Sequence, residues 1–211
     1  MTDRNNDHAV SYSANPLADI LSVALGRDRA CEASEALLAK YGTLGTLLSE
    51  TEEEICECGG FNISTALLIK LLGYINSRRV TDNFEFGKTC EEIELREYIR
   101  ALFYGISVET VYLILLDEKN RVIGCEYMGE GTVNASDVYP RKLLGCAVKK
   151  KAKGAILAHN HPKGVAEPSK EDISTTKRLC GIFTTARIKF FSHYIVADGE
   201  ISKIDTGIFF D

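Results

Sequence analysis

The sequence predicts a mixed α/β protein, in which an N-terminal all-α module precedes a domain with a mixed β-sheet flanked by helices. Up to about residue 80, apolar residues recur at the spacing of helices, without the alternation that is typical of strands. After residue 105, short apolar runs alternate with helical segments, which indicates a sheet covered on both sides. Residues 81–92 break the helical periodicity between the two regions, and we interpret them as a linker.

The helical module is expected to span residues 16–80. Its first helix begins at Pro16 and stops at Gly26, because proline suits a first helical turn and glycine a helix end. A second helix ends at Gly42, and the residues that follow supply a short helix, a turn and a long helix. Residues 1–15 are polar and aperiodic, so we expect them to be flexible.

The second domain is expected to span residues 93–211 and to begin with the helical segment EEIELREYIRALFYG. The run ETVYLILLDEKNRVIGCEYMGEGTV predicts two strands joined by the turn DEKN, which is typical of a β-hairpin. The remaining segments predict a helix, a short buried strand, a helix and two closing strands: SDVYPRKLLGCAVKKKAK, GAILAHN, SKEDISTTKRLCGIFTTA and IKFFSHYIVADGEISKI.

Composition excludes several classes of protein. Of the 211 residues, 45% are hydrophobic and 26% charged, and no apolar run approaches the length of a membrane span. The first residues do not have the pattern of a signal or transit peptide, so we expect a cytoplasmic protein that does not bind membranes. A net charge of −5 means that nucleic-acid binding would require a local basic patch. We interpret Cys56 and Cys58, in the run CEC, as packing residues rather than a metal-ligand pair.

The stretch from Ile156 to Asp172, ILAHNHPKGVAEPSKED, carries the chemistry. Side chains alternate along a strand, so His159 and His161 point to one side at the end of a strand and can share a metal ion. Ser169 opens a helix whose first turn brings Asp172 back toward the strand end. Two imidazoles and one carboxylate leave a tetrahedral zinc one open position, as in catalytic sites. The alternatives are a Ser-x-x-Asp helix cap and histidines that are only hydrogen-bonded loop residues.

HNHP, followed by Ser169 and Asp172, resembles the HxHPx(6)SxxD signature of JAMM (MPN+) zinc metalloproteases, and residues 108–199 resemble RadC proteins. The resemblance implies a cytidine-deaminase-like fold and one Zn²⁺ per chain. By the same resemblance, His159, His161 and Asp172 would be the zinc ligands, and Ser169 would lie near the bound water or the oxyanion. The pattern also needs a glutamate as general base. We expect this to be Glu109, which precedes an apolar strand; the alternatives are Glu126 and then Glu130.

One departure from the RadC pattern affects a third histidine. The usual aspartate before the late histidine is Ser192 here, so His193 has lost an expected partner, and we interpret it as structural.

The helical module resembles the helix-hairpin-helix of RadC proteins, but its hairpin is Gly60, Phe61 and Asn62 with acidic residues around it. A side chain at Asn62 and the flanking negative charge disfavour phosphate, so packing or partner contact is favoured over DNA binding. The sequence therefore predicts a zinc-dependent hydrolase that cleaves peptide or isopeptide bonds of a peptide or protein substrate. The alternative is a DNA-repair-associated accessory protein, with a structural or idle metal site, that binds nucleic acid or a partner. The sequence does not predict an oligomeric state.

Overall fold

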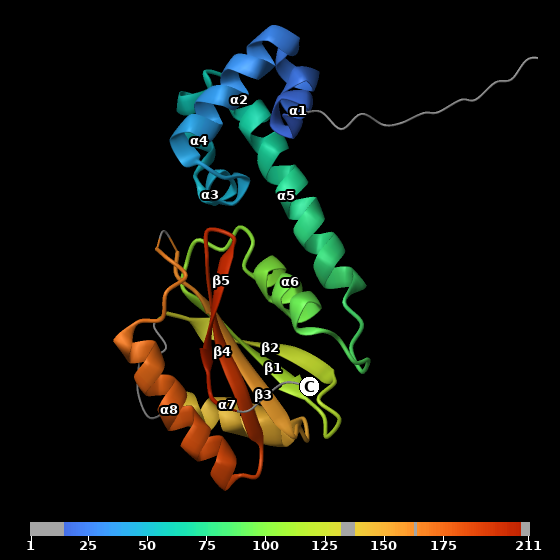
Figure 1. Cartoon of the computed structure of the whole chain (residues 1–211), viewed down its shortest axis with the longest axis vertical. Helices are drawn as coiled ribbons and strands as arrows, with labels where there is room; N and C mark the ends of the chain where they lie inside the picture. The colour runs from blue at the N-terminus through green and yellow to red at the C-terminus, as the bar shows by residue number, and fades with distance from the viewer. Residues whose placement is uncertain (1–14, 132–137, 163, 208–211) are drawn as a thin grey trace, which may run out of the picture. The chain divides into compact units, whose positions relative to one another are not determined.

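A computed structural model describes residues 15–131, 138–162 and 164–207. Within these residues it contains eight helices and one five-stranded mixed sheet, which confirms the expected fold class (Figure 1). The chain divides into two compact units between Leu71 and Leu72, inside helix α5. The flexibility expected for residues 1–15 concerns a segment that, apart from Asn15, lies outside the described residues.

The first unit is helical and has its own core. Its helices are α1 (Pro16–Leu25), α2 (Arg27–Tyr41), α3 (Leu44–Ser49), α4 (Glu52–Gly59) and the first part of α5 (Ile63–Asn83). They bury one apolar cluster, which consists of Leu17, Leu21, Ala30, Ala33, Leu37, Leu47, Ile55, Ala66 and Ile69. Cys56 and Cys58 pack against this cluster, as expected for cysteines that act as small apolar residues. Helix α5 continues to Asn83, so it extends into the range 81–92 that we interpreted as a linker.

In the part of the chain that the structure describes, no single helix has both the length and the apolar composition required to cross a bilayer. One bent pair, α4 with α5, meets the criteria by length and composition only.

The second unit is a sheet between two helical layers. Its elements after α5 are α6 (Glu92–Leu102), β1 (Thr110–Leu116), β2 (Val122–Glu130), α7 (Val138–Lys149), β3 (Gly154–Asn160), α8 (Lys170–Thr185), β4 (Lys189–Ala197) and β5 (Glu200–Asp205). The strand order is β2-β1-β3-β4-β5; β3 and β4 are parallel and all other neighbours are antiparallel. The β3–β4 crossover passes through α8, so the end of β3 and the start of α8 are separated by one short connection.

Each face of the sheet has its own apolar core. Helices α7 and α8 cover one face, through residues such as Leu143 and Phe183, and α6 covers the other, through residues such as Leu95 and Ile99. All seven residues of β3 are therefore buried, which accounts for the uninterrupted apolar run before the histidines.

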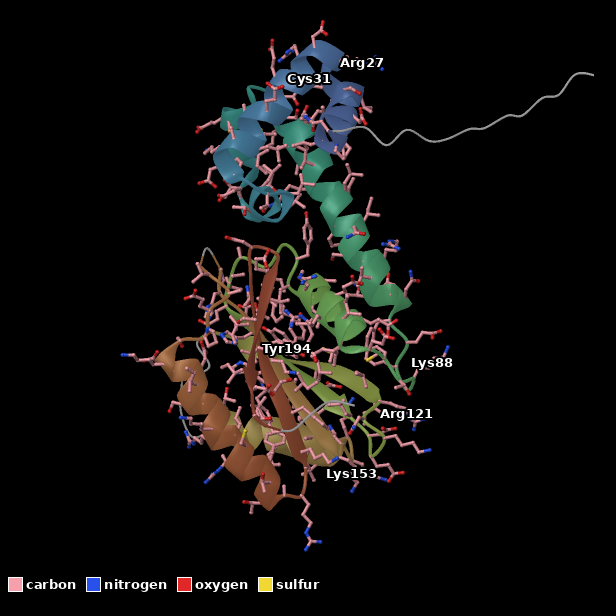
Figure 2. All side chains as sticks on the ribbon, in the orientation of Figure 1. Arg27, Cys31, Lys88, Arg121, Lys153 and Tyr194 are labelled. Carbon is pink, nitrogen blue, oxygen red and sulfur yellow. The ribbon has the colours of Figure 1, made fainter. Side chains whose placement is uncertain are left out.

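The predicted turn DEKN joins β1 and β2. The Oδ1 atom of Asp117 accepts hydrogen bonds from the backbone N–H groups of Lys119 (2.8 Å) and Arg121 (3.0 Å), and Asn120 adopts a left-handed conformation with φ of 59°. The Arg121 side chain, labelled in Figure 2, donates from Nε to Asp117 Oδ2 at 2.7 Å. The hydrogen bond from Arg121 lowers the pKa of Asp117 below its ordinary value, so the turn is held by a charged carboxylate.

Candidate metal centre

The two histidines lie where β3 leaves the sheet. His159 is completely buried on the face covered by α8, and His161 follows the last strand residue with about a quarter of its side chain exposed (24%). The backbone N–H of His161 donates to the carbonyl of Val196 at 2.8 Å, which continues the β3–β4 pairing one residue beyond the strand. The alternation of the strand therefore places both imidazoles on the same side, as the sequence predicted.

Asp172 reaches the histidines because Ser169 caps α8. The Ser169 Oγ accepts from the Asp172 backbone N–H at 3.0 Å, while Ser169 N–H and Oγ–H donate to Asp172 Oδ2 at 2.8 Å and 2.7 Å. This is a capping box, so the cap that the sequence offered as an alternative is present. The capping box uses the Oδ2 atom of Asp172 as its hydrogen-bond acceptor, whereas the Oδ1 atom lies 3.2 Å from His159 Nε2. The cap therefore orients the carboxylate toward the histidines.

The spacing of the three side chains suits a small divalent cation. His159 Nε2 and His161 Nε2 are 2.9 Å apart, and Asp172 oxygens lie 3.2 Å and 3.4 Å from these two nitrogens. Ligand atoms around a tetrahedral zinc with bonds of about 2.0–2.1 Å are roughly 3.3 Å apart. Among the described residues, His159, His161 and Asp172 are the group of three that could hold a metal ion.

The charge states of the group also suit a cation. Burial raises the pKa of Asp172, but the adjacent His159 ring and the hydrogen bonds from Ser169 lower it by more, so the pKa lies well below its ordinary value and the group is a carboxylate. His161 Nδ1 lies 3.1 Å from the carbonyl oxygen of Val165, which can only accept a hydrogen bond. The Nδ1 atom of His161 therefore carries a proton, and its Nε2 is the nitrogen that faces Asp172 and His159.

The segment that carries Glu109 lies beside the end of β3. Val111 of β1 is paired with His159, and the carbonyl of Glu109 accepts from the backbone N–H of Gly131 at 2.8 Å. Within the described residues, the Glu109 carboxylate forms no hydrogen bond or ion pair. Glu109 stands two residues before Val111, on the segment that leads into β1 where this strand is paired with the histidine end of β3.

The two alternative glutamates are placed differently. Glu126 of β2 forms an ion pair with Lys150 (2.6 Å). In the sheet it is paired with Leu113, which is two residues past Val111 and therefore further from the strand end that carries the histidines. Glu130 is paired with Thr110, so its side chain points to the face opposite that of Val111 and His159. These placements favour Glu109 over both.

Asn160, between the two histidines, is a site residue that our sequence reasoning missed. Its Oδ1 accepts from the backbone N–H of Thr110 at 2.7 Å, and its Nδ2 donates to the carbonyls of Ile106 and Val108 at 3.2 Å and 3.1 Å. The side chain is buried and all three contacts go to the segment around Glu109. An asparagine inside an apolar strand run is a sequence signal for such a role, because a buried amide needs partners.

The helical unit shows why its hairpin departs from the expected phosphate-binding pattern. Gly60 ends α4 in a left-handed conformation (φ 64°, ψ 35°), and α5 starts at a bend of 119° from α4. The Oδ1 atom of Asn62 accepts from the backbone N–H and the hydroxyl of Thr65 at 3.1 Å and 3.2 Å. Asn62 therefore caps the start of α5 with its own side chain.

The fold and the site define a class: an α/β domain in which a strand-end His-x-His pair and a carboxylate from the next helix could bind a metal ion. Residues 90–207 match the family model of the RadC-like JAB domain, and the chain belongs to this family. The resemblance noted in the sequence is thereby confirmed.

Curated relatives agree with this family. The chain is 34% identical over 171 residues to a UPF0758 protein of Vibrio atlanticus (strain LGP32), covering 81% of this chain and 76% of the relative. It is 32% identical over 189 residues to a UPF0758 protein of Shewanella piezotolerans, covering 89% and 84% respectively. The names of these relatives state no activity.

Proposed function

We propose that the protein is a zinc-dependent hydrolase of the JAMM type, which cleaves a peptide or isopeptide bond in a peptide or protein substrate. The observation that carries the proposal is the convergence of ligand atoms from His159, His161 and Asp172, all within 4.8 Å of one another. Two neutral imidazoles and one carboxylate, supplied by a strand end and a helix start, form the donor set of catalytic zinc sites with one position left for water. Membership of the RadC-like JAB family supports the same reaction class.

Each residue of the candidate site has a distinct role in the proposed reaction. A zinc ion held by the three side chains would lower the pKa of water to about 7 and polarise the substrate carbonyl. Glu109 accepts a proton from the attacking water and donates it to the leaving nitrogen, as the water oxygen bonds to the carbonyl carbon and the C–N bond breaks. Ser169 holds Asp172 through its cap, and by its place in the family's signature its hydroxyl would lie near the reacting oxygen.

The strand register supports Glu109 as the general base. Val111 and His159 are directly paired, so their side chains share a face of the sheet. Glu109 precedes Val111 by two residues and His161 follows His159 by two, so both extend from the same paired ends of β1 and β3. A carboxylate on this segment can serve a metal-bound water without being a ligand itself, as general-base chemistry demands.

The test separates metal binding from chemistry. Purified full-length protein should contain about one zinc per chain and should cleave members of a quenched fluorescent library of linear and lysine-branched peptides, with cleavage sites identified by mass spectrometry. His161→Ala should lose both zinc and cleavage. Glu109→Gln should keep zinc and lose cleavage by about 10²–10⁴-fold, the usual contribution of a general base.

Glu126→Gln is the matched control for Glu109→Gln, because Glu126 is a strand glutamate engaged by Lys150. Cleavage by Glu126→Gln should stay near that of the unmodified protein. A protein without zinc, or an unimpaired Glu109→Gln variant, would contradict the proposal.

A further inference from the structure

A third imidazole lies directly behind the candidate metal centre. His193 of β4 is completely buried, and its Nε2 lies 2.8 Å from Nδ1 of His159. Its other nitrogen, Nδ1, lies 2.8 Å from Oγ1 of Thr176 on α8. Both ring nitrogens of His193 are therefore engaged, one by the histidine of the site and one by the helix that carries Asp172.

The direction of these hydrogen bonds follows from Thr176. Its hydroxyl donates to the backbone carbonyl of Asp172 at 2.7 Å, and a carbonyl can only accept. A hydroxyl has one hydrogen, so Thr176 Oγ1 accepts from His193 Nδ1, which must carry a proton. His193 has no exposed surface and neither of its hydrogen-bond partners is a carboxylate, so a second proton would create a desolvated cation that forms no direct ion pair. Its Nε2 is consequently an acceptor, and His159 Nδ1 is the donor.

We infer that His193 and Thr176 are positioning residues that fix His159 in the tautomer whose Nε2 lone pair faces the metal position. The outer hydrogen bond of a metal-ligating histidine is known in general to set its tautomer and ring orientation. Here that bond goes to another histidine, which is itself oriented by a threonine. The inference rests on the proposed function in taking zinc as the metal.

The contacts close into a ring. From Asp172 the ring passes through Thr176, His193 and His159 and returns to the Asp172 carboxylate, whose Oδ1 lies 3.2 Å from His159 Nε2. It joins α8, β4 and β3, so the positions of two ligands depend on one another. When both imidazoles carry a single proton at Nδ1, their Nε2 atoms, 2.9 Å apart, both offer lone pairs, and a cation between them stabilises this arrangement.

Zinc affinity of the full-length protein, measured by competition with a chelating dye, tests the inference without reference to activity. His193→Leu removes the acceptor for His159 and should weaken zinc binding by about 10–100-fold, as is typical for such partners. Thr176→Val should weaken it in the same direction. His193→Gln, which offers an oxygen near the position of Nε2, and Thr176→Ser, which keeps the hydroxyl, should restore most of the affinity.

Tyr194→Phe is the matched control. Tyr194, labelled in Figure 2, is the next residue of β4; it is buried on the other face, and its hydroxyl donates to Glu92 of α6 at 3.1 Å. Its loss should leave zinc affinity unchanged, whereas a general loosening of β4 would lower it.

A second readout reports the tautomer itself. Nitrogen-15 NMR of the metal-free protein should show His159 protonated at Nδ1, and Thr176→Val should shift it toward a mixture of tautomers. Unchanged zinc affinity in His193→Leu and Thr176→Val, or a His159 ring protonated at Nε2, would overturn the inference and leave the hydrolase proposal intact. If the protein bound no zinc but His159 were protonated at Nδ1, the proposed function would be overturned. The assignment of the His159 tautomer to His193 and Thr176 would still hold.

Discussion

The side-chain amide of Asn160 uses its acceptor and both donor directions on the chain segment from Ile106 to Thr110, where Glu109 is located. His159 and His161 on either side of it point to the opposite face of the strand, toward Asp172. One tripeptide thus serves two purposes: the histidines belong to the candidate metal centre, and the asparagine attaches the neighbouring segment to the same strand end.

Asn160→Ala should therefore impair catalysis more than metal binding. It leaves the buried N–H of Thr110 and the carbonyl of Ile106 without this partner, while the carbonyl of Val108 keeps the hydroxyl of Thr110. Each group that water does not reach costs about 1–3 kcal/mol of folding free energy. We expect kcat/KM for a cleaved peptide to fall further than zinc affinity, because the ligands keep their own contacts while the segment of Glu109 loses its attachment. Asn62→Ala, which removes a helix cap in the other unit, controls for lost stability. Equal losses of zinc affinity and kcat/KM would argue against this function of Asn160.

At the scale of elements, two helices begin with the same capping box but differ in what it supports. Thr51 caps α4 with Glu54 as its partner, and Ser169 caps α8 with Asp172 as its partner. Replacing either cap residue by Ala should cost about 1 kcal/mol of helix stability, visible as faster amide exchange in the first turn. Ser169→Ala should in addition lower zinc affinity by about 10–100-fold, because Asp172 loses the bonds that orient it. A similar zinc affinity in both variants would show that the cap does not position the ligand.

The boundaries of the elements followed closely from local signals in the sequence. Pro16 and Ser169 mark helix starts, and the change from helical to strand periodicity marks the second unit; these features depend on neighbouring residues only. The metal-ligand candidates were predictable for the same reason, since a strand end and the next helix start are close along the chain.

The contacts around His193 were not predictable in this way. His193 lies 34 positions after His159, and their contact depends on the parallel register that pairs Leu157 with His193. We interpreted His193 as structural because the residue before it, Ser192, is not the usual aspartate. Its partner is instead Thr176, on a different element. The choice among glutamates likewise depended on long-range facts, namely the pairing of Glu126 with Lys150 and the face to which Glu130 points.

At the scale of the whole molecule, the metal-ligand candidates all belong to the second unit, and they connect β3 to α8. The helical unit has a separate apolar core. Its described residues contain no cluster of three His, Cys, Asp or Glu side chains that could hold a metal ion. Zinc binding should therefore be linked to the folding of residues 72–211 and not to that of the helical unit.

Zinc should slow amide exchange in one unit of the full-length chain. A ligand that binds only the folded state stabilises it by about 2.7 kcal/mol when its free concentration is 100 times Kd. Exchange measured by mass spectrometry should slow in peptides from β3 and α8 after zinc is added to the metal-free protein, and should stay unchanged in peptides from α1 to α4. His161→Ala should abolish the response, which identifies the site as its origin. If zinc slowed amide exchange in both units, the two units would unfold together. Zinc bound in the second unit can protect amides of the first unit only if the first unit cannot unfold without the second.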